Sequence, residues 1–449
     1  MNDTICAIAT LVGESSINVI RISGDKSIEI VNSIFDRDLT KKESHTISYG
    51  HIVDNDERID EVLVSVFKSP KTFTTEDVVE INSHGGKICV NKILELLLNK
   101  GCRLAEPGEF LKRAFLNGRI DLVEAEAVSD MINSKTDSAR KMSMRGINKE
   151  LSKKIDDLRD NIMSLVANIE VNIDYLEYED ELVITKEIVE EKIKYVKDKI
   201  NELLDNSKNG VIIKNGINIS IVGKPNVGKS SILNKLLGED KAIVTSVKGT
   251  TRDIVEGSTI INGIEVNFFD TAGIRKTDEI VESIGIEKSI KKMEESDLVL
   301  FVISSSEKID DEDMEILEKL KDKKILVIYN KVDLSNSKDE RLKDYDYIEM
   351  SLKDDKYVKQ LKNKIVEIFK LNDIEKSDYT YISNSRQISL LNNCLDIIDD
   401  INKKIKSDIP IDLIEIDIKL LLDKLGEITG NTYENELIDK IFSNFCLGK

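Results

Sequence analysis

The chain has 449 residues, of which 65 are Lys or Arg and 84 are Asp or Glu, giving a formal net charge of −19 at pH 7. This length leaves room for about three domains. The acidic balance argues against a protein that grips nucleic acid through a basic face of its own, so an RNA substrate would need a local patch or a partner protein.

The five cysteines are scattered and lack any CxxC spacing. This pattern predicts neither a disulfide framework nor a zinc site. The N-terminus has no basic region of the kind that begins a signal peptide, and no apolar run approaches the length that spans a bilayer. We therefore expect a soluble, cytoplasmic protein without a membrane partner.

Residues 1–117 mix short apolar strands, such as Ile17–Ile22 and Glu61–Phe67, with a helical pattern of apolar residues. The apolar positions of that pattern are Ile88, Ile93, Leu96 and Leu97. Alternating strand and helix periods in so short a stretch predict a small α+β domain.

Long amphipathic helices are predicted over residues 118–210 and again over residues 376–449. Neither helical half is expected to fold on its own. We therefore expect one all-α domain that is interrupted by an inserted domain at 215–372. The polar segment Asp205–Gly210 is the expected linker, since insertion at an exposed loop is well tolerated.

The inserted part begins with Gly223–Ser230, which reads Gly-Lys-Pro-Asn-Val-Gly-Lys-Ser. It follows the apolar run Ile217–Val222 and precedes a helical pattern, which is the context of a phosphate-binding loop. In such a loop Lys229 reaches the β- and γ-phosphates of a nucleotide, and the Ser230 hydroxyl ligates Mg²⁺.

Two polar segments after this loop fit switch regions. Thr250 and Thr251 lie in the first, where a hydroxyl could complete the metal shell only while the γ-phosphate is present. The second, Asp270–Gly273, follows a buried strand pattern and reads Asp-Thr-Ala-Gly. An acidic residue at such a strand end holds magnesium indirectly, and the glycine lets the backbone approach the γ-phosphate.

A further buried strand pattern ends in Asn330–Asp333, which reads Asn-Lys-Val-Asp. The carboxylate of Asp333 can accept hydrogen bonds from the ring N–H and the exocyclic amine of guanine, a pair of donors that adenine lacks. The nucleotide is therefore predicted to be GTP. Ser351–Lys353 stands where GTPases place a loop that touches the base. A charge run such as Asp310–Asp313 is interpreted as solvated surface.

Ile274 occupies the position at which Ras-like GTPases carry the glutamine that orients the attacking water. A catalytic carboxylate must then come from elsewhere, and Thr277–Ser283 is the nearest acidic stretch. No arginine can be assigned as a finger. The side-chain oxygen of Asn226 could instead hold a monovalent cation near the phosphates, although it could also merely brace the loop.

Over its whole length the chain resembles the MnmE or TrmE family of tRNA-modification GTPases. Besides the GTPase motifs, the segments that carry this resemblance are Asp3–Ile5, Arg21–Gly24, Phe73–Glu80, His84–Gly86, Pro107–Phe110, Arg113–Leu122 and Phe445–Lys449. The resemblance implies three parts: an N-terminal α+β folate-binding domain, an all-α helical domain, and an inserted Ras-like α/β P-loop GTPase domain.

The resemblance also implies an activity and partners. Such proteins form homodimers through the N-terminal domain, and GTP hydrolysis proceeds through dimerisation of the GTPase domains. With a flavin- and NADH-dependent partner, MnmG, they install an aminomethyl or carboxymethylaminomethyl group at C5 of the wobble uridine of certain tRNAs. The one-carbon donor is a formyl or methylene tetrahydrofolate, and the partner is expected to hold most of the tRNA.

Site residues follow from the resemblance one by one. Potassium is expected at Asn226, Thr245, Val247 and Thr250, and magnesium at Ser230 and Thr251. Glu282 is the expected water-orienting residue. The expected GTP contacts are Asn226, Val227, Gly228, Lys229, Ser230, Ser231, Thr245, Ser246, Val247, Lys248, Gly249, Thr250, Thr251, Asp270, Thr271, Ala272, Gly273, Asn330, Lys331, Asp333, Ser351, Leu352 and Lys353.

Folate contacts are expected at Arg21, Glu80, Arg119 and Lys449, with Cys446 near the folate and involved in the modification chemistry. On the residues alone, a buried structural cysteine is the alternative for Cys446. The chain departs from the family pattern at residues 11–16, which read Leu-Val-Gly-Glu-Ser-Ser where the family has a proline- and glycine-rich loop.

Two other classes compete with this interpretation. A GTP switch in ribosome assembly or RNA remodelling would generally carry a basic RNA-binding domain, for which the acidic helices are a poor substitute. A dynamin-like membrane remodeller would need an apolar or polybasic membrane element, and the sequence offers none.

Overall fold

The computed structural model describes residues 3–13, 15–174, 186–238, 257–270, 294–335, 338–376 and 382–448. The chain divides into two compact units. Unit 1 comprises Met1–Asn133, Ser143–Ile200 and Ser389–Lys449, and unit 2 comprises Ser134–Met142 and Asn201–Ile388.

Unit 1 begins with a six-stranded sheet in the order β3-β4-β5-β2-β1-β6. Its strands are β1 (Ile5–Ile8), β2 (Ile17–Ser23), β3 (Thr46–Asp54), β4 (Glu57–Phe67), β5 (Val78–His84) and β6 (Arg103–Leu104). All neighbouring pairs are antiparallel except β1 with β6. On β4 the alternate residues Val62, Val64 and Val66 are buried, which is the pattern of a strand with one covered face.

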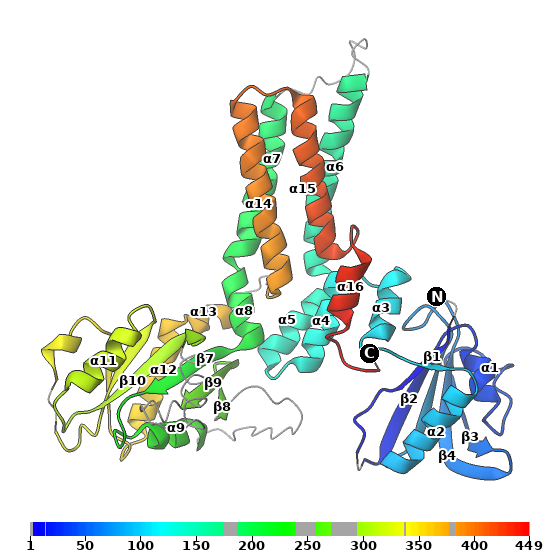
Figure 1. Ribbon diagram of the computed structural model, residues 1–449, viewed down its shortest axis with the longest axis horizontal. Coiled ribbons are helices and arrows are strands. Elements are labelled where there is room, and N and C mark those ends of the chain that lie inside the picture. Colours follow the sequence, from blue (N-terminus) through cyan, green and yellow to red (C-terminus); the bar gives the residue numbers. More distant parts are fainter. Residues whose placement is uncertain are drawn as a thin grey trace, which may run out of the picture. The chain divides into compact units, whose positions relative to one another are not determined.

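Helices α1 (Ser27–Asn32) and α2 (Lys87–Asn99) cover that face of the sheet (Figure 1). In α2 the residues Ile93, Leu96 and Leu97 are buried in the shared core, as their spacing predicts. Ile88, in the first turn, is 89 % exposed instead, and Val90 takes the buried position. The next helix, α3 (Glu109–Leu116), leads out of the sheet region toward the long helices.

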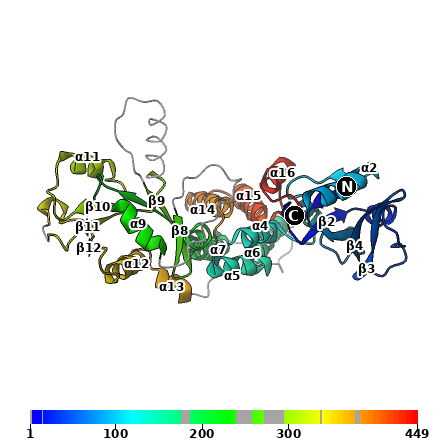
Figure 2. The same cartoon turned by 90° about the horizontal axis from the view of Figure 1, so that it is seen from below.

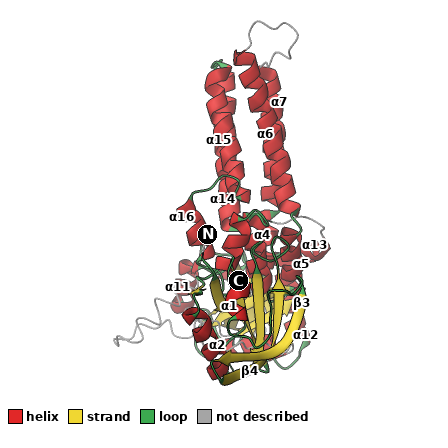
Figure 3. Cartoon of the chain, turned by 90° about the vertical axis from the view of Figure 1, so that its right-hand side faces the viewer, coloured by secondary structure: helices red, strands yellow, loops and turns green. Residues whose placement is uncertain are grey.

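The rest of unit 1 is helical. Its elements are α4 (Leu122–Asn133), α6 (Glu150–Asp174), α7 (Lys186–Asp205), α14 (Ser385–Lys406), α15 (Ile411–Thr429) and α16 (Asn435–Phe442). The four long helices α6, α7, α14 and α15 run alongside one another (Figures 1 and 3). Ion pairs join neighbours across the bundle, such as Lys404 with Asp417 at 2.5 Å and Lys419 with Glu170 at 2.6 Å.

Unit 2 contains a second six-stranded sheet, in the order β12-β11-β10-β7-β9-β8. Its strands are β7 (Ile217–Val222), β8 (Gly257–Ile261), β9 (Ile264–Asp270), β10 (Leu298–Ser304), β11 (Ile325–Asn330) and β12 (Tyr347–Met350). All pairs are parallel except the β8–β9 hairpin. Strands β10 and β11 are buried along their whole length, as expected for a parallel sheet covered on both faces.

Among its described residues, unit 2 has the helices α8 (Ser207–Asn215), α9 (Lys229–Gly238), α11 (Asp311–Lys319), α12 (Lys356–Ile368) and α13 (Leu371–Lys376), with a short turn η1 (Glu340–Leu342). Apolar residues of α8, α9, α12 and α13 form one core with the sheet, and those of α11 form another. Figure 2 shows α11 and α12 on opposite sides of the strands.

A further helix, α5 (Asp137–Ile147), contributes its first half to unit 2 and its second half to unit 1. In unit 2, Ala139 is buried in the core beside Ile213, and Lys135 is ion-paired with Glu265 of β9 at 3.0 Å. Gly263, at the turn of the hairpin, has a φ of 75°, and a Cβ there would lie 2.8 Å from Oγ of Ser138. The glycine thus allows close packing of this segment.

The three-part fold class predicted from the sequence is confirmed: an α+β N-terminal part, a helical part and a Ras-like α/β part. The predicted linker at Asp205–Gly210 is wrong, because residues from Ser207 onward are helical. The Ser207 hydroxyl donates to the Leu204 carbonyl at 2.7 Å, and Ile213 is buried in the core of unit 2. Burial of one apolar side of α8 therefore outweighs the polar composition of the segment.

Candidate active site

The loop of residues 223–228 leaves β7 and leads directly into α9. Gly228 has a φ of 105°, and a Cβ there would lie 2.2 Å from Nδ2 of Asn330. That amide donates to the Val227 carbonyl at 2.7 Å. The absence of a side chain at Gly228 therefore lets the end of β11 hold the loop at the start of α9, where free N–H groups and the helix dipole attract anions.

Lys229 is enclosed by the same loop. Its Nζ donates to the carbonyls of Gly223 at 2.7 Å and Lys224 at 2.8 Å. These bonds hold the ammonium group where phosphates bound by the loop would meet it.

The other wall comes from the residues that follow β11. The ammonium of Lys331 donates to the Asn226 carbonyl at 2.8 Å. Asp333 accepts from the Ser351 hydroxyl at 2.8 Å and is ion-paired with Lys353 at 2.7 Å. The Lys353 ammonium and the Ser351 hydroxyl hold the pKa of Asp333 below its usual value. The carboxyl group is therefore ionised at neutral pH and available as an acceptor.

These residues line a pocket of about 650 Å³. Its lining consists of Asn226, Gly228, Lys229, Ser230, Ser231, Asn330, Lys331, Asp333, Leu334, Ser351, Leu352 and Lys353. All of them except Leu334 were expected from the sequence. Leu334 is 65 % exposed, and its only signal was its position directly after the Asn330–Asp333 motif.

Several expected site residues lie outside the described residues. They are Thr245, Ser246, Val247, Lys248, Gly249, Thr250, Thr251, Thr271, Ala272, Gly273, Glu282 and Lys449. Asp270 ends β9, where its backbone pairs with that of Ile221 in β7. The two predicted switch segments therefore flank the β8–β9 hairpin in the chain.

A second pocket, of about 590 Å³, lies within the N-terminal part of unit 1. It is lined by His45, Phe67, Pro70, Lys71, Thr72, Phe73, Thr75, Val78, Glu80, Asn117, Gly118 and Arg119. Glu80 and Arg119, both expected folate contacts, are among them. The third, Arg21, is ion-paired with Glu80 at 2.9 Å. The structure thus brings three of the four expected folate residues together.

The Phe73 ring contacts both arginines of this site, Arg21 and Arg119. The guanidinium of Arg21 lies 5.1 Å and that of Arg119 5.0 Å from its ring centroid, within the range of cation–π attraction. Arg119 also donates to the Phe73 carbonyl at 3.0 Å.

The C-terminal segment of unit 1 reaches the same region. The Gly108 N–H donates to the Cys446 carbonyl at 3.2 Å, and Arg21 donates to the Gly448 carbonyl at 3.3 Å. Cys446 itself is exposed, so the alternative of a buried structural cysteine is wrong. Its thiol is accessible to a substrate or partner.

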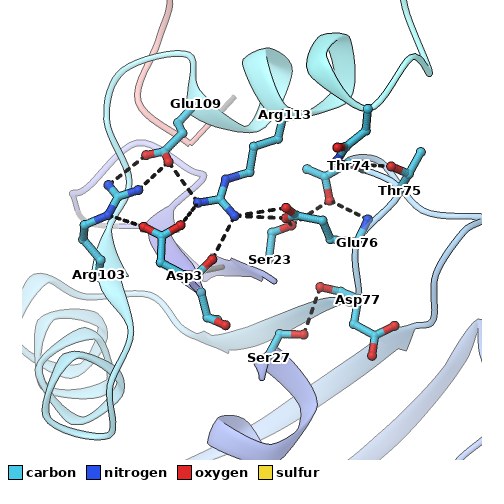
Figure 4. Close-up of polar contacts among 12 residues, drawn as sticks. Asp3, Ser23, Ser27, Thr74, Thr75, Glu76, Asp77, Arg103, Glu109 and Arg113 are labelled. Atoms are coloured by element: carbon cyan, nitrogen blue, oxygen red, sulfur yellow. Dashed lines mark hydrogen bonds and ion pairs between the residues drawn. The ribbon is translucent and has the colours of Figure 1, made fainter. Parts of the chain in front are cut away.

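The side chain of Arg113 lies at the centre of a network of ion pairs in the same part of unit 1 (Figure 4). The Arg113 guanidinium, 1 % exposed, pairs with Glu76 at 3.1 Å, with Glu109 at 3.1 Å and with Asp3 at 2.7 Å. Glu76 in turn accepts from the Ser23 hydroxyl at 2.7 Å. Sequence reasoning did not find this network. Glu109 and Arg113 have the i,i+4 spacing of a helical ion pair, but Asp3 and Glu76 come from distant parts of the chain and no spacing links them to Arg113.

A parallel sheet with a phosphate loop after one strand and Asn-Lys-Val-Asp after another defines a P-loop GTPase. Two family descriptions match the chain: the MnmE helical domain over residues 122–446, and the N-terminus of the GTP-binding protein TrmE over residues 4–119. The chain belongs to the MnmE family of tRNA modification GTPases, and it is a GTP hydrolase.

Full-length relatives agree with this assignment. The tRNA modification GTPase MnmE of Bacillus cytotoxicus is 48 % identical over 455 residues, which cover 100 % of this chain and 99 % of the relative. That of Enterococcus faecalis is 46 % identical over 457 residues, covering 100 % and 98 %. The resemblance inferred from the sequence motifs is therefore confirmed.

Solved structures of other GTPases match part of the chain. Era of Aquifex aeolicus bound to GDP·AlF4⁻ is 31 % identical over 34 % of this chain and 56 % of its own, with a TM-score of 0.27. The G domain of the T. maritima FeoB iron transporter is 26 % identical over 34 % and 97 %, with the same TM-score of 0.27. At such TM-scores these likenesses add nothing to the assignment.

Proposed function

We propose that this GTPase is activated by potassium and acts with an MnmG-type flavin- and NADH-dependent partner on tRNA. The reaction is the addition of an aminomethyl or carboxymethylaminomethyl group at C5 of the wobble uridine, with a tetrahydrofolate as one-carbon donor. The observation that carries the proposal is the presence on one chain of two pockets. One is lined by GTPase motifs, and the other is lined by Glu80 and Arg119. Arg21 links the second pocket to the segment bearing Cys446, since it pairs with Glu80 and donates to the Gly448 carbonyl.

The GTP pocket supports the nucleotide part of the proposal. Lys229 would meet the β- and γ-phosphates, Ser230 and Thr251 would ligate magnesium, and Asp333 would accept from guanine. Magnesium neutralises charge that develops on the phosphates, while the chain's own residues orient them. Ser230 fits the role, since it lines the pocket beside Lys229.

Potassium would be held by Asn226, Thr245, Val247 and Thr250. Of these, Asn226 is described: it lines the GTP pocket with a φ of 64°, and its carbonyl accepts from Lys331. Because this carbonyl faces the Lys331 ammonium, which would repel a second cation, the side-chain oxygen of Asn226 is the expected ligand. A cation there would supply the positive charge that an arginine finger supplies in other GTPases. Glu282 would orient the attacking water.

The N-terminal pocket fits a folate in size and chemistry. A pterin ring presents a ring N–H and an exocyclic amine, a pair that the Glu80 carboxylate can accept, and the folate tail is anionic, which suits Arg21, Arg119 and Lys449. Cys446 would then act in the modification chemistry at this pocket.

The homodimer finds support in the uncovered face of the N-terminal sheet. Residues that alternate with the buried ones point away from the core helices, and among them Ile17 is 60 %, Ile47 66 %, Tyr49 47 % and Leu63 45 % exposed. Tyr49 and Leu63 are direct cross-strand neighbours. An apolar sheet face of this kind is typical of an interface. GTP-dependent pairing of the GTPase domains would couple hydrolysis to the folate pockets.

Mass spectrometry of tRNA nucleosides tests the function as a whole. A strain that lacks this protein should lose the modified wobble uridine, and the intact gene should restore it. A Cys446→Ser variant should hydrolyse GTP at the parent rate and fail to restore the modification. A parent-level amount of modified wobble uridine in the deletion strain would contradict the proposed tRNA reaction. The same amount in the strain carrying Cys446→Ser would show that Cys446 takes no part in the chemistry.

The potassium assignment is tested by the rate of hydrolysis in matched chloride salts. We expect the rate to be roughly a hundredfold higher in potassium than in sodium, because removing one group that stabilises charge in the transition state lowers a rate by about that factor. An Asn226→Ala variant should lose this difference. Equal rates in both salts for the parent protein would contradict the assignment.

For Glu282→Ala we expect unchanged GTP affinity and a turnover lower by about a hundredfold or more.

A further inference from the structure

The second residue of the phosphate loop, Lys224, directs its ammonium away from the pocket that the loop lines. It is absent from the lining residues, and its side chain is only 14 % exposed. The ammonium is ion-paired with Asp310 and, at 2.7 Å, with Asp313. Both carboxylates raise the pKa of Lys224, although burial alone would lower it.

The two carboxylates belong to the first turn of α11 and are fixed by the helix itself. Asp310 is the N-cap, and its side chain accepts from the N–H groups of Glu312 at 3.0 Å and Asp313 at 3.2 Å. The Asp313 carboxylate accepts in return from the Asp310 N–H at 3.2 Å. This reciprocal capping box orders both acids. The interpretation of Asp310–Asp313 as solvated surface is therefore wrong for Asp313, which is 5 % exposed.

The backbone of Lys224 connects this ion pair to the lysine that meets the phosphates. The Lys224 carbonyl is an acceptor of the Lys229 ammonium. A fixed side chain at Lys224 therefore fixes a carbonyl that orients Lys229. From the other side, Asn330 and Lys331 hold the carbonyls of Val227 and Asn226, so the loop is anchored at both ends.

We propose that Lys224, Asp310 and Asp313 form a clamp that positions the phosphate loop and Lys229 for GTP hydrolysis. Lys224 is then a positioning residue, and Asp310 and Asp313 act through it. The proposal depends on GTP hydrolysis alone and is independent of potassium, folate and tRNA. The competing assignment for Lys224 is a direct phosphate ligand, which the neighbouring carboxylates would oppose by neutralising its charge.

The test compares Lys224→Met, Asp313→Asn and the double variant, with Glu312→Gln as a matched control from the same turn of α11. Each protein is measured for kcat and KM of GTP hydrolysis and for thermal unfolding, with rates taken well below the melting temperature. We expect kcat/KM to fall about ten- to hundredfold in each single variant, because small displacements of catalytic groups cost rates of that order. The double variant should be no worse than the single ones, since both remove the same interaction. Glu312→Gln should match the parent.

Lys224→Arg should recover most of the lost kcat/KM, because a guanidinium can pair with the same carboxylates. If Lys224 were a phosphate ligand, Asp313→Asn would leave kcat/KM unchanged or raise it, and the proposal would be overturned. A lower melting temperature with the parent value of kcat/KM would also overturn it, by showing that the clamp only stabilises the fold.

Discussion

Arg113 holds its charge where water does not reach, and three carboxylates from separate parts of the chain compensate it. Without Arg113, Asp3 and Glu109 still contact Arg103, whereas Glu76, whose side chain is 13 % exposed, loses its ion pair. Loss of one partner of such a buried pair costs about 3–5 kcal/mol. We therefore expect Arg113→Met to lower the free energy of unfolding of unit 1 by that amount in urea titrations followed by circular dichroism.

Arg103 provides the matched control for Arg113. It contacts the same acids, Asp3 and Glu109, but its side chain is 43 % exposed. Water can replace it, so Arg103→Met should lower the free energy of unfolding by only about 1 kcal/mol. Equal losses in the two variants would show that burial is not the source of the difference.

His84 is expected to make stability depend on pH. Its Nδ1 lies 2.7 Å from the Asp60 carboxylate, which raises the pKa of His84. His84 in turn lowers the pKa of Asp60, against the effect of burial. The ion pair therefore stabilises the fold fully at pH values between the ordinary aspartate pKa of 3.8 and the ordinary histidine pKa of 6.5. This stabilisation is lost as the pH rises through the elevated pKa of folded His84.

The measurement is the free energy of unfolding of His84→Gln against the parent over a range of pH. The deficit of the variant should shrink as the pH rises above 6.5. His45→Gln is the control, because His45 contacts the Ser44 hydroxyl in place of a carboxylate. A deficit that is constant with pH would refute the ion pair as its cause.

At the scale of single residues, the sequence anticipated all but one of the residues that line the pocket at the phosphate loop, and their contacts with GTP stay a prediction. The groups of this pocket sit in short contiguous motifs at strand ends, and backbone geometry carries such motifs into one place. The Arg113 network and the Lys224 clamp were not predicted. Each joins residues far apart in the chain. The spacing of Asp310 and Asp313 fits a capping box, but nothing local indicates that Asp313 is buried against Lys224.

At the scale of elements, the first half of α5 is the unexpected component of unit 2. Ala139 is 5 % exposed in its core, where extra methylene groups cost about 1–3 kcal/mol. We expect Ala139→Leu to lower the free energy of unfolding of unit 2 by that amount. The transition of unit 2 is identified as the one whose midpoint rises when GDP is added. Lys141→Leu, at an exposed position of the same helix, should change the transition by less than about 0.5 kcal/mol.

The strands and helices themselves followed from periodicity, but the role of α5 did not. Its exposed face is charged like that of any surface helix, and the burial of one alanine leaves no hydrophobic stripe to detect. The linker error at Asp205–Gly210 has the same cause. The single buried side of α8 is shorter than the window over which an amphipathic period becomes visible.

At the scale of the whole molecule, the boundaries of unit 2 set which fragments fold. Residues 215–372, the boundaries predicted for the GTPase domain, omit α8 and the buried Ile374. We expect this fragment to unfold at lower urea concentration than residues 201–388, which retain both. In the full chain, which also contains Ala139, unit 2 should unfold at a still higher urea concentration. The same midpoint for all three would contradict the division of the chain.

The division has a further consequence for synthesis on the ribosome. Helix α6 buries Leu158, Ile162 and Ile169, and α15, which packs along it, is made only after all of residues 201–388. At ordinary translation rates roughly 190 residues take on the order of 10–40 s. During that time the apolar stripe of α6 lacks α15 as its partner, so the nascent chain should bind chaperones, and slowed translation should lower its yield.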